Sequence, residues 1–287
     1  MRETHAAAAD PDAASDEGMT KVTRRLMAGT GWKMNLRAFE VPGYAQRLLQ
    51  QIGTGDTSAI DLFVLPPFTS LAAAAAAFGG TPVAIGGQNM HWEEHGAWTG
   101  EISASMLVDA GCRYVELAHS ERLQHFGETY ERVRSKVDRA LATGLTPILC
   151  LGETAEDRRR GGSDDVLAWQ VTTALAGQPA ARVPDVVLAY EPRWAIGGSE
   201  AASCEYVAAR HAMLRALLRE RFGADVASRT RILYGGSVTP RNGPDLVALD
   251  DVDGLFVGRA AWNPDGFAQI VAEVADAARA KTGRSGS

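Results

Sequence analysis

The sequence contains three polar residues whose types suit proton transfer beside a carbonyl group: Lys33, His119 and Glu191. Each follows, within a few positions, a short run of residues rich in apolar side chains. A carboxylate can remove a proton from carbon, an imidazole can polarise the carbonyl oxygen, and an ammonium group can stabilise the negative charge that develops. If the three apolar runs end at one edge of a sheet, these side chains form a set for proton abstraction.

Glycine-rich turns follow the last three apolar runs of the chain. A glycine lets backbone N–H groups approach an anion closely, and the N-terminus of a following helix adds a partial positive charge. We therefore predict a phosphate site at Gly197, Ser237, Gly258 and Arg259, with a small phosphorylated sugar as the ligand. The turns are Ile196-Gly197-Gly198-Ser199, Tyr234-Gly235-Gly236-Ser237 and Val257-Gly258-Arg259.

Each of these features has a plainer explanation when it is taken alone. A single His at a strand end is more often structural than catalytic, and a single Lys or Glu there is usually a solvated charge. Gly-Gly pairs are common in ordinary turns. The prediction of a site therefore depends on all of these residues lying together on one rim of the fold.

The elements that must position these residues are short apolar runs that alternate with longer segments of helical periodicity. This pattern indicates repeated strand–helix units around a parallel sheet. Val133, Val137 and Leu141, for example, recur on one helix face, and Gly144 provides a left-handed stop. The eight runs are Arg25–Gly29, Ile60–Leu65, Pro82–Gly86, Tyr114–Ala118, Thr146–Cys150, Asp185–Tyr190, Arg231–Tyr234 and Gly254–Val257.

Eight strand–helix units within residues 24–280 match a closed (β/α)8 barrel, which has a typical size of roughly 250 residues and its active site at the C-terminal strand ends. No linker rich in Pro, Gly or Ser divides this body, so we predict a single α/β domain. A doubly wound open sheet is the alternative, but its dinucleotide-binding fingerprint is absent from the sequence. Residues 1–23 are expected to be a disordered N-terminal extension, and residues 281–287 a flexible tail.

Composition and charge argue against two kinds of partner. The chain has 287 residues, of which 46% are hydrophobic, and its net charge is −6. Nucleic-acid binding depends on Lys and Arg that neutralise phosphates, so no nucleic acid is expected as a partner. Arg158-Arg159-Arg160 is interpreted as a solvated helix face. The longest apolar run, Leu71–Phe78, is far shorter than the roughly 20 residues that a membrane span needs, so no membrane partner is expected.

The cysteines indicate a reducing compartment. Cys112, Cys150 and Cys204 are well separated and form neither a disulfide framework nor a zinc-binding pattern. We therefore expect a cytoplasmic protein. The sequence shows no cluster of metal ligands and no nucleotide fingerprint, so neither a metal nor a redox cofactor is expected.

Residues 25 to about 280 resemble the triosephosphate isomerase family in seven motifs that occur in the family's order. The resemblance implies a TIM barrel and an isomerase that moves a carbonyl group between adjacent carbons through a cis-enediolate. The motifs are Gly31-Trp32-Lys33-Met34-Asn35, Gln88-Asn89-Met90, Gly96-Ala97-Trp98-Thr99-Gly100-Glu101, His119-Ser120-Glu121-Arg122, Cys150-Leu151-Gly152-Glu153, Tyr190-Glu191-Pro192 with Trp194-Ala195-Ile196-Gly197, and Tyr234-Gly235-Gly236-Ser237.

The same resemblance implies individual roles for the site residues. Glu191 would be the base that carries the proton, His119 would polarise the oxygens of the enediolate, and Lys33 would supply positive charge. Glu121 is implied as the partner that orients Lys33, because a buried ammonium group needs pairing. Cys150 matches a cysteine near the base, and a small buried apolar residue is an equally good interpretation of it.

Two loops also take implied roles from the resemblance. Pro192–Ser199 resembles a mobile lid that excludes water as it closes and places the Gly197 N–H on the phosphate. Gln88–Glu101 resembles a loop that inserts into a second subunit, with Thr99 close to that subunit's catalytic residues. The resemblance therefore implies a homodimer.

The sequence departs from the family pattern at the site itself. Members that interconvert the trioses carry Asn before Trp-Lys, where this chain has Gly31, and small residues where it has Arg259. The lid lacks Thr-Gly-Lys after Gly197, Leu123 stands where a second Arg is usual, and Trp98 replaces the more frequent Phe. These changes resemble a bacterial branch of the family, the L-erythrulose-1-phosphate isomerases of tetritol catabolism.

The sequence alone leaves three functions open. L-Erythrulose 1-phosphate is dihydroxyacetone phosphate with an extra hydroxymethyl group on the carbon that loses its proton, and Gly31 leaves space there; we favour this substrate, with D-erythrulose 4-phosphate as product. An ordinary triosephosphate isomerase is the alternative, in which the missing amide costs roughly 2–4 kcal/mol of transition-state stabilisation. A non-catalytic phosphosugar-binding barrel is the third, disfavoured because Lys33, His119 and Glu191 are all present.

Overall fold

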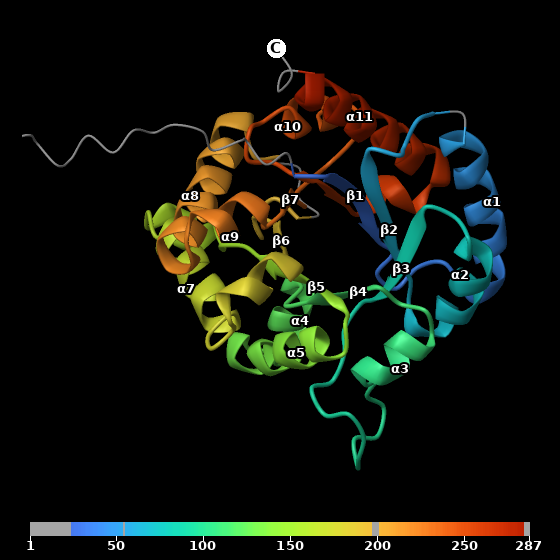
Figure 1. The fold of residues 1–287 in the computed structure, drawn as a ribbon, viewed down its shortest axis with the longest axis horizontal. Helices are drawn as coiled ribbons and strands as arrows, with labels where there is room; N and C mark the ends of the chain where they lie inside the picture. The colour runs from blue at the N-terminus through green and yellow to red at the C-terminus, as the bar shows by residue number, and fades with distance from the viewer. Residues whose placement is uncertain (1–23, 54, 197–200, 284–287) are drawn as a thin grey trace, which may run out of the picture.

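Eight parallel strands form a closed barrel in which each strand pairs with the next along the chain and β8 pairs with β1. The computed structural model describes residues 24–53, 55–196 and 201–283. Figure 1 shows the strands as a central ring with the helices around it, which confirms the predicted single-domain TIM barrel. The strands are β1 (Leu26–Gly31), β2 (Ile60–Leu65), β3 (Val83–Gly87), β4 (Tyr114–Leu117), β5 (Thr146–Leu151), β6 (Val187–Tyr190), β7 (Ile232–Tyr234) and β8 (Gly254–Val257).

The helices return the chain from the end of one strand to the start of the next. The α-helices are α1 (Val41–Ile52), α2 (Leu71–Phe78), α3 (Ala104–Asp109), α4 (Ser120–His125), α5 (Tyr130–Ala142), α6 (Ala155–Arg159), α7 (Ser163–Ala174), α8 (Cys204–Phe222), α9 (Ala224–Arg229), α10 (Gly243–Val247) and α11 (Pro264–Gly283). Short 3₁₀ helices are η1 (Ala38–Glu40), η2 (Phe68–Ser70), η3 (Ala180–Asp185) and η4 (Arg259–Trp262).

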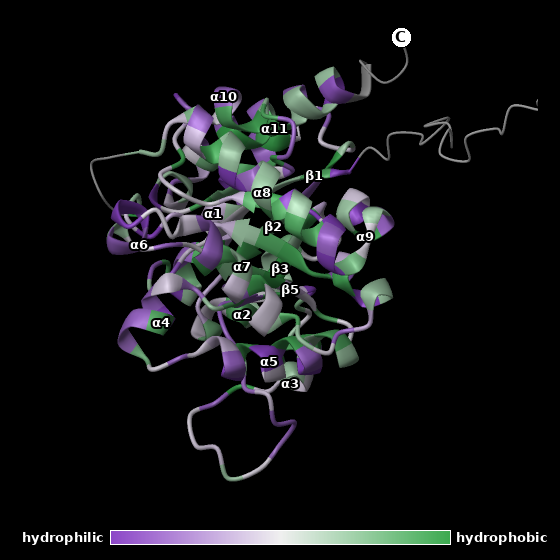
Figure 2. Cartoon of the chain, turned by 90° about the vertical axis from the view of Figure 1, so that its left-hand side faces the viewer, coloured by the Kyte–Doolittle hydropathy of each residue, from purple (hydrophilic) through white to green (hydrophobic). Residues whose placement is uncertain are grey.

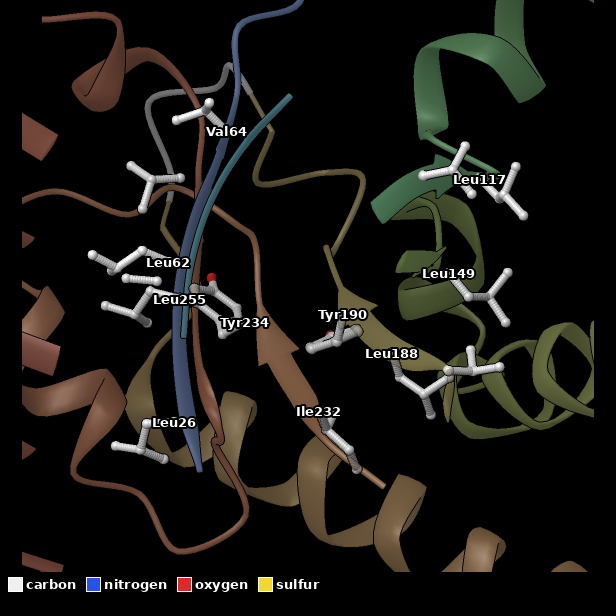
Figure 3. Packing of buried hydrophobic residues seen from close by; sticks show 14 of the residues in the cluster. Leu26, Leu62, Val64, Leu117, Leu149, Leu188, Tyr190, Ile232, Tyr234 and Leu255 are labelled. Atoms are coloured by element: carbon white, nitrogen blue, oxygen red, sulfur yellow. The ribbon is translucent and has the colours of Figure 1, made fainter. Parts of the chain in front are cut away.

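The strands separate two hydrophobic layers, because successive side chains of a strand point to opposite faces. The outer layer packs the strands against the apolar faces of the helices; Figure 3 shows part of it, including Leu117, Leu149 and Leu188 from three neighbouring strands. The inner layer fills the barrel with residues such as Phe63 and Tyr114. Because both faces of the sheet are buried, the strands are nearly continuous apolar segments, which appear green in the middle of Figure 2.

Several element boundaries differ from the predicted ones. Gly31 is the last residue of β1 and pairs with Leu65, whereas the sequence placed it after the strand. Asp185 ends η3 and does not begin β6, because the next backbone N–H, of Val186, donates to the Val183 carbonyl oxygen at 3.0 Å and so closes a 3₁₀ turn around Asp185. Helix α11 continues to Gly283, three residues past the predicted end of the domain, and residues 1–23 and 284–287 lie outside the described residues. The left-handed stop at Gly144 is confirmed by its φ of 83°.

The loop between β3 and α3 projects away from the barrel, at the bottom of Figures 1 and 2. An aromatic cluster shapes its base: the ring centroids of His91 and Trp92 lie 4.1 Å apart, and those of His91 and Trp98 4.3 Å apart. Arg139 Nε donates a hydrogen bond to the Trp92 carbonyl oxygen at 3.0 Å, which ties the loop to α5. Among the described residues, no helix has both the length and the apolar composition that crossing a membrane requires.

Candidate active site

A cavity of about 540 Å³ opens at the C-terminal ends of the strands. Eight of the predicted site residues line this cavity, namely Gly31, Lys33, His119, Glu121, Glu191, Ser237, Gly258 and Arg259. Cys150 lies buried beneath it, and Thr99 is exposed on the loop that projects from the barrel. Gly197 lies outside the described residues. Residues far apart in the sequence therefore lie around one cavity, because each follows a strand of the same parallel barrel.

His119 is held as a neutral, oriented imidazole. It is the N-cap residue of α4, and its Nδ1 accepts a hydrogen bond from the Glu121 backbone N–H at 3.2 Å. This assigns the ring proton to Nε2, which lies 3.6 Å from Glu191 Oε2. Burial, together with the positive charge of Lys33, lowers the pKa of His119 to about 4. The ring therefore presents an uncharged N–H donor to the cavity at neutral pH.

Glu191 follows β6 and has its carboxyl group buried at the floor of the cavity mouth, with 5% of the residue exposed. Burial raises the pKa of Glu191 well above its usual range, and the neighbouring Glu116 raises it further. A Cβ on Gly235 would lie 2.7 Å from Glu191 Oε1, so only glycine leaves room for this carboxyl group in its observed position. A carboxylate with a raised pKa is a stronger base than an ordinary one.

Lys33 reaches the cavity from a strained backbone position with a φ of 52°. Gln88 Nε2 holds that position by donating to the carbonyl oxygens of Lys33 and Leu65, both at 2.9 Å. Lys33 Nζ donates to Glu121 Oε1 at 2.6 Å, which is the pairing that the sequence predicts. The ammonium group of Lys33 is not buried as predicted, because the Lys33 side chain is 27% exposed and that of Glu121 is 47% exposed in the open cavity.

The structure places a further ionisable group in the cavity wall, Glu116, which was not predicted from the sequence. Glu116 lies in β4, three residues before His119, and only 6% of it is exposed. Burial raises the pKa of Glu116 to about 8. Cys150 Sγ lies 3.8 Å from Glu116 Oε1 and 3.9 Å from Glu191 Oε1, so the thiol bridges the two carboxyl groups. A glutamate inside the apolar run Tyr114–Ala118 is the sequence signal that could have found it.

Gly31 lines the cavity beside these groups. A Cβ placed on Gly31 would lie 3.5 Å from Phe256 Cζ and 3.8 Å from Glu116 Oε2, both ordinary van der Waals contacts. Neither close packing nor a positive φ therefore requires glycine at this position. What glycine provides is the space that the rest of a longer side chain would fill.

Two of the predicted phosphate turns follow β7 and β8, and the β8 turn lies next to Gly31, because β8 pairs with β1. Asn242 Nδ2 donates to the Ser237 carbonyl oxygen at 2.8 Å and fixes the first turn. Helix η4 begins directly after Gly258, and its Trp262 Nε1 donates to the Gly31 carbonyl oxygen at 3.3 Å. Arg259 is exposed at the cavity rim, and in the described part of the chain no carboxylate pairs with it.

A buried carboxylate anchors the start of the predicted lid. Glu153 accepts hydrogen bonds from Trp194 Nε1 at 2.8 Å and from the Tyr206 hydroxyl group at 2.9 Å. The Arg158 guanidinium group lies 3.9 Å from the centroid of the Trp194 ring. Arg158, Arg159 and Arg160 are all exposed, as predicted, and Arg158 in addition lies over the Trp194 ring.

The ligand atoms of Glu116, His119 and Glu191 all lie within 4.8 Å of one another, a spacing that can also hold a metal ion. Two carboxylates and one imidazole are common metal ligands. Burial raises the pKa of Glu116 in this group to about 8. The arrangement fits acid–base chemistry on carbon.

Comparison with known proteins matches residues 26–274 to the family model described as triosephosphate isomerase. The chain belongs to the triosephosphate isomerase family. It is 42% identical over 250 residues to a triosephosphate isomerase of Rhodopirellula baltica, with 87% of this chain and 98% of the relative covered. It is 44% identical over 253 residues to an L-erythrulose-1-phosphate isomerase of Brucella abortus, with 88% and 97% covered.

The fold of this triosephosphate isomerase family member agrees with a solved relative. The crystal structure of triosephosphate isomerase from Bartonella henselae is 34% identical and superposes with a TM-score of 0.78, covering 87% of this chain and 98% of the other. Relatives with both names lie within a similar range of identity. The comparisons therefore identify a sugar-phosphate isomerase and leave its substrate to the chemistry of the site.

Proposed function

We propose that the protein interconverts L-erythrulose 1-phosphate and D-erythrulose 4-phosphate. The observation that carries this proposal is Gly31 in the cavity wall beside the buried carboxyl groups, at a position where neither backbone geometry nor packing requires glycine. The four-carbon substrate differs from the triose by a hydroxymethyl group on the carbon that loses its proton. An enzyme for it needs added room at that carbon and an otherwise unchanged site.

In this mechanism Glu191 removes the proton from C3 of the ketose and returns it to C2. His119 Nε2–H donates hydrogen bonds to the oxygens on these carbons, and Lys33 stabilises the negative charge of the enediolate. A neutral imidazole suits this role, because the proton it shares is closer in acidity to that of the enediol than an imidazolium proton is. Glu121 positions Lys33 through their hydrogen bond of 2.6 Å.

The phosphate group would bind at Ser237 and Gly258, with Gly197 of the lid completing the site. Arg259 at the rim would add positive charge, since guanidinium groups bind phosphate well. Lid closure excludes water, which favours reprotonation of the enediolate over loss of phosphate. No metal ion or redox cofactor takes part in this scheme.

Triosephosphate isomerisation is the second candidate, because relatives of that name match the chain at 42% identity and its catalytic groups would be the same. The two candidates differ only at the carbon beside Gly31. For a triose phosphate the space there would be filled by water, and the polar contact of an amide side chain would be lost.

We further propose a homodimer formed through the loop Gln88–Glu101, with Thr99 entering the partner's cavity. The loop projects from the barrel (Figure 1), and its Trp98 is 47% exposed. Met34, beside Lys33, is 95% exposed and is suited to be covered by such a loop. Sedimentation that shows only monomer at micromolar concentration would contradict this assembly.

We place the reaction in the cytoplasm as part of tetritol catabolism. The three cysteines are free thiols, of which Cys112 and Cys150 are buried, and this suits a reducing compartment. The assignment to tetritol catabolism follows from the proposed substrate, so a different substrate would refute it.

Proton NMR in D₂O tests the proposed reaction directly. L-Erythrulose 1-phosphate incubated with the protein is expected to give D-erythrulose 4-phosphate carrying deuterium at the carbon that receives the proton. Glu191→Gln is the matched control, because it keeps the size of the side chain and removes the base. Absence of product with the native protein, while dihydroxyacetone phosphate is converted, would establish the triose reaction instead.

A further inference from the structure

Glu116 is a buried carboxyl group to which none of the roles above gives a task. It is 6% exposed and lies in the uppermost interior layer of the barrel, in the wall of the cavity. Within the described residues its one hydrogen-bonding neighbour is the Cys150 thiol, at 3.8 Å. A carboxyl group withdrawn from water with only a weak thiol contact is costly to the folded state. Such a group is typical of a site that completes its hydrogen bonds with a ligand.

The position of Glu116 relates it to the reacting carbon. Its oxygens lie within 4.8 Å of the ligand atoms of Glu191 and His119, the groups assigned to the proton and the oxygen. Glu116 Oε2 also lies 3.8 Å from the point where a Cβ of Gly31 would be. Glu116 therefore borders the open space at Gly31 on the side next to the base.

The walls of this space match a hydroxymethyl group. The ring of Phe256 supplies an apolar surface, 3.5 Å from the Cβ position of Gly31, which suits a methylene carbon. The carboxyl group of Glu116 supplies a partner for a hydroxyl group. Because burial raises the pKa of Glu116 to about 8, the group is uncharged at neutral pH and can both donate and accept a hydrogen bond. An uncharged group also avoids placing a second negative charge beside the enediolate.

We propose that Glu116 determines substrate specificity by hydrogen-bonding the terminal hydroxyl group of a ketose phosphate longer than a triose. The inference rests on the proposed function, because a triose phosphate offers no group for Glu116 to bind. Gly31 leaves room for the hydroxymethyl group, and Glu116 forms a hydrogen bond with its hydroxyl group.

Two substitutions separate the hydrogen bond from the shape of the site. Glu116→Leu removes the polar group and keeps a similar volume, and Glu116→Gln keeps an uncharged group that can donate and accept. For each variant, kcat/KM is measured on L-erythrulose 1-phosphate and on dihydroxyacetone phosphate. Glu116→Leu is expected to lose about 10- to 100-fold on the tetrulose, as for one buried hydrogen bond, and to change little on the triose.

Glu116→Gln is expected to retain most of the preference for the tetrulose, which a merely structural role would not predict. Thermal unfolding checks the fold, and Glu116→Leu is expected to be no less stable than the native protein. An equal loss on both substrates, or an unchanged ratio in Glu116→Leu, would overturn the role of Glu116. If the native protein does not convert the tetrulose at all, both the proposed function and this inference are refuted. If the native preference for the tetrulose persists unchanged in Glu116→Leu, only the role of Glu116 is refuted.

Discussion

Replacing Glu116 by Gln is expected to stabilise the protein, and the gain is expected to grow with pH. Burial raises the pKa of Glu116 from 4.5 to about 8. Between these values the carboxyl group is protonated in the folded protein and ionised in the unfolded chain, so unfolding releases a proton. The free energy of unfolding therefore falls as pH rises through this window. Gln mimics the protonated acid and has no such pH dependence.

The size of the effect follows from the shift in pKa. Each pKa unit corresponds to roughly 1.36 kcal/mol, so a rise from 4.5 to about 8 gives a cost of about 5 kcal/mol once Glu116 is ionised in the folded state. The stability difference between Glu116→Gln and the native protein is expected to be small at pH 5 and to approach this value at pH 9. Relaxation around the charge makes this an upper figure.

Urea unfolding at pH 5, 7 and 9, at one protein concentration, measures this difference. Glu220→Gln is the control, because Glu220 is an exposed carboxyl group on α8, outside the loop proposed to join two subunits, and its replacement removes one surface charge. A stability difference for Glu116→Gln that is the same at all three pH values, or that shrinks with rising pH, would refute a buried, protonated carboxyl group at this position.

Further predictions concern activity. Gly31→Asn is expected to lower kcat/KM on the tetrulose and to maintain or raise it on the triose. Gly31→Ala, which adds only a Cβ in ordinary contact, is expected to have a smaller effect. A rise in kcat/KM on the tetrulose alone would contradict the proposal that Gly31 makes room for the hydroxymethyl group. Glu191→Asp draws the base back from the carbon and is expected to reduce kcat by about 100-fold or more with little change in inhibitor affinity. In the pH profile, kcat/KM should fall on the acid side as Glu191 is protonated, with a midpoint above that of an ordinary carboxyl group, because burial raises its pKa. Glu116→Gln should leave that midpoint nearly unchanged, since Glu116 is itself uncharged below about pH 8 and Gln keeps an uncharged group there. A midpoint that moves clearly to lower pH would show that Glu116 is ionised beside Glu191 in the native protein. Arg259→Ala should weaken binding of inorganic phosphate, and unchanged affinity would place Arg259 outside the phosphate site.

The fold was predictable because the chain repeats one strand–helix unit, and few arrangements of such units bury both faces of every strand. Eight apolar runs separated by amphipathic helices leave a closed parallel barrel as the arrangement that buries every run. Boundaries were less accurate, because strand ends depend on pairing partners; Gly31 is a strand residue owing to its register with Leu65. Asp185 falls in η3 because the Val186 N–H bonds to the Val183 carbonyl oxygen rather than to a neighbouring strand.

The candidate site was predictable where a side chain follows a strand end, as for His119 and Glu191. Glu116 was not predicted as a site residue because it lies within a strand, and the apolar run around it indicates a buried core segment. The contact of the exposed Arg158 with Trp194 was not predicted, because Trp194 lies 36 positions away and is brought close only by the fold. Ion pairs and ring contacts between different strand–helix units are set by tertiary packing, which a local pattern does not encode.

The measurement that tests the account most directly is kcat/KM of the native protein on L-erythrulose 1-phosphate and dihydroxyacetone phosphate, side by side, with coupling enzymes free of isomerase. The account predicts a strong preference for the tetrulose, because the space at Gly31 and the carboxyl group of Glu116 serve its hydroxymethyl group. A preference for the triose would contradict the account and make both residues tolerated variations of an ordinary triosephosphate isomerase.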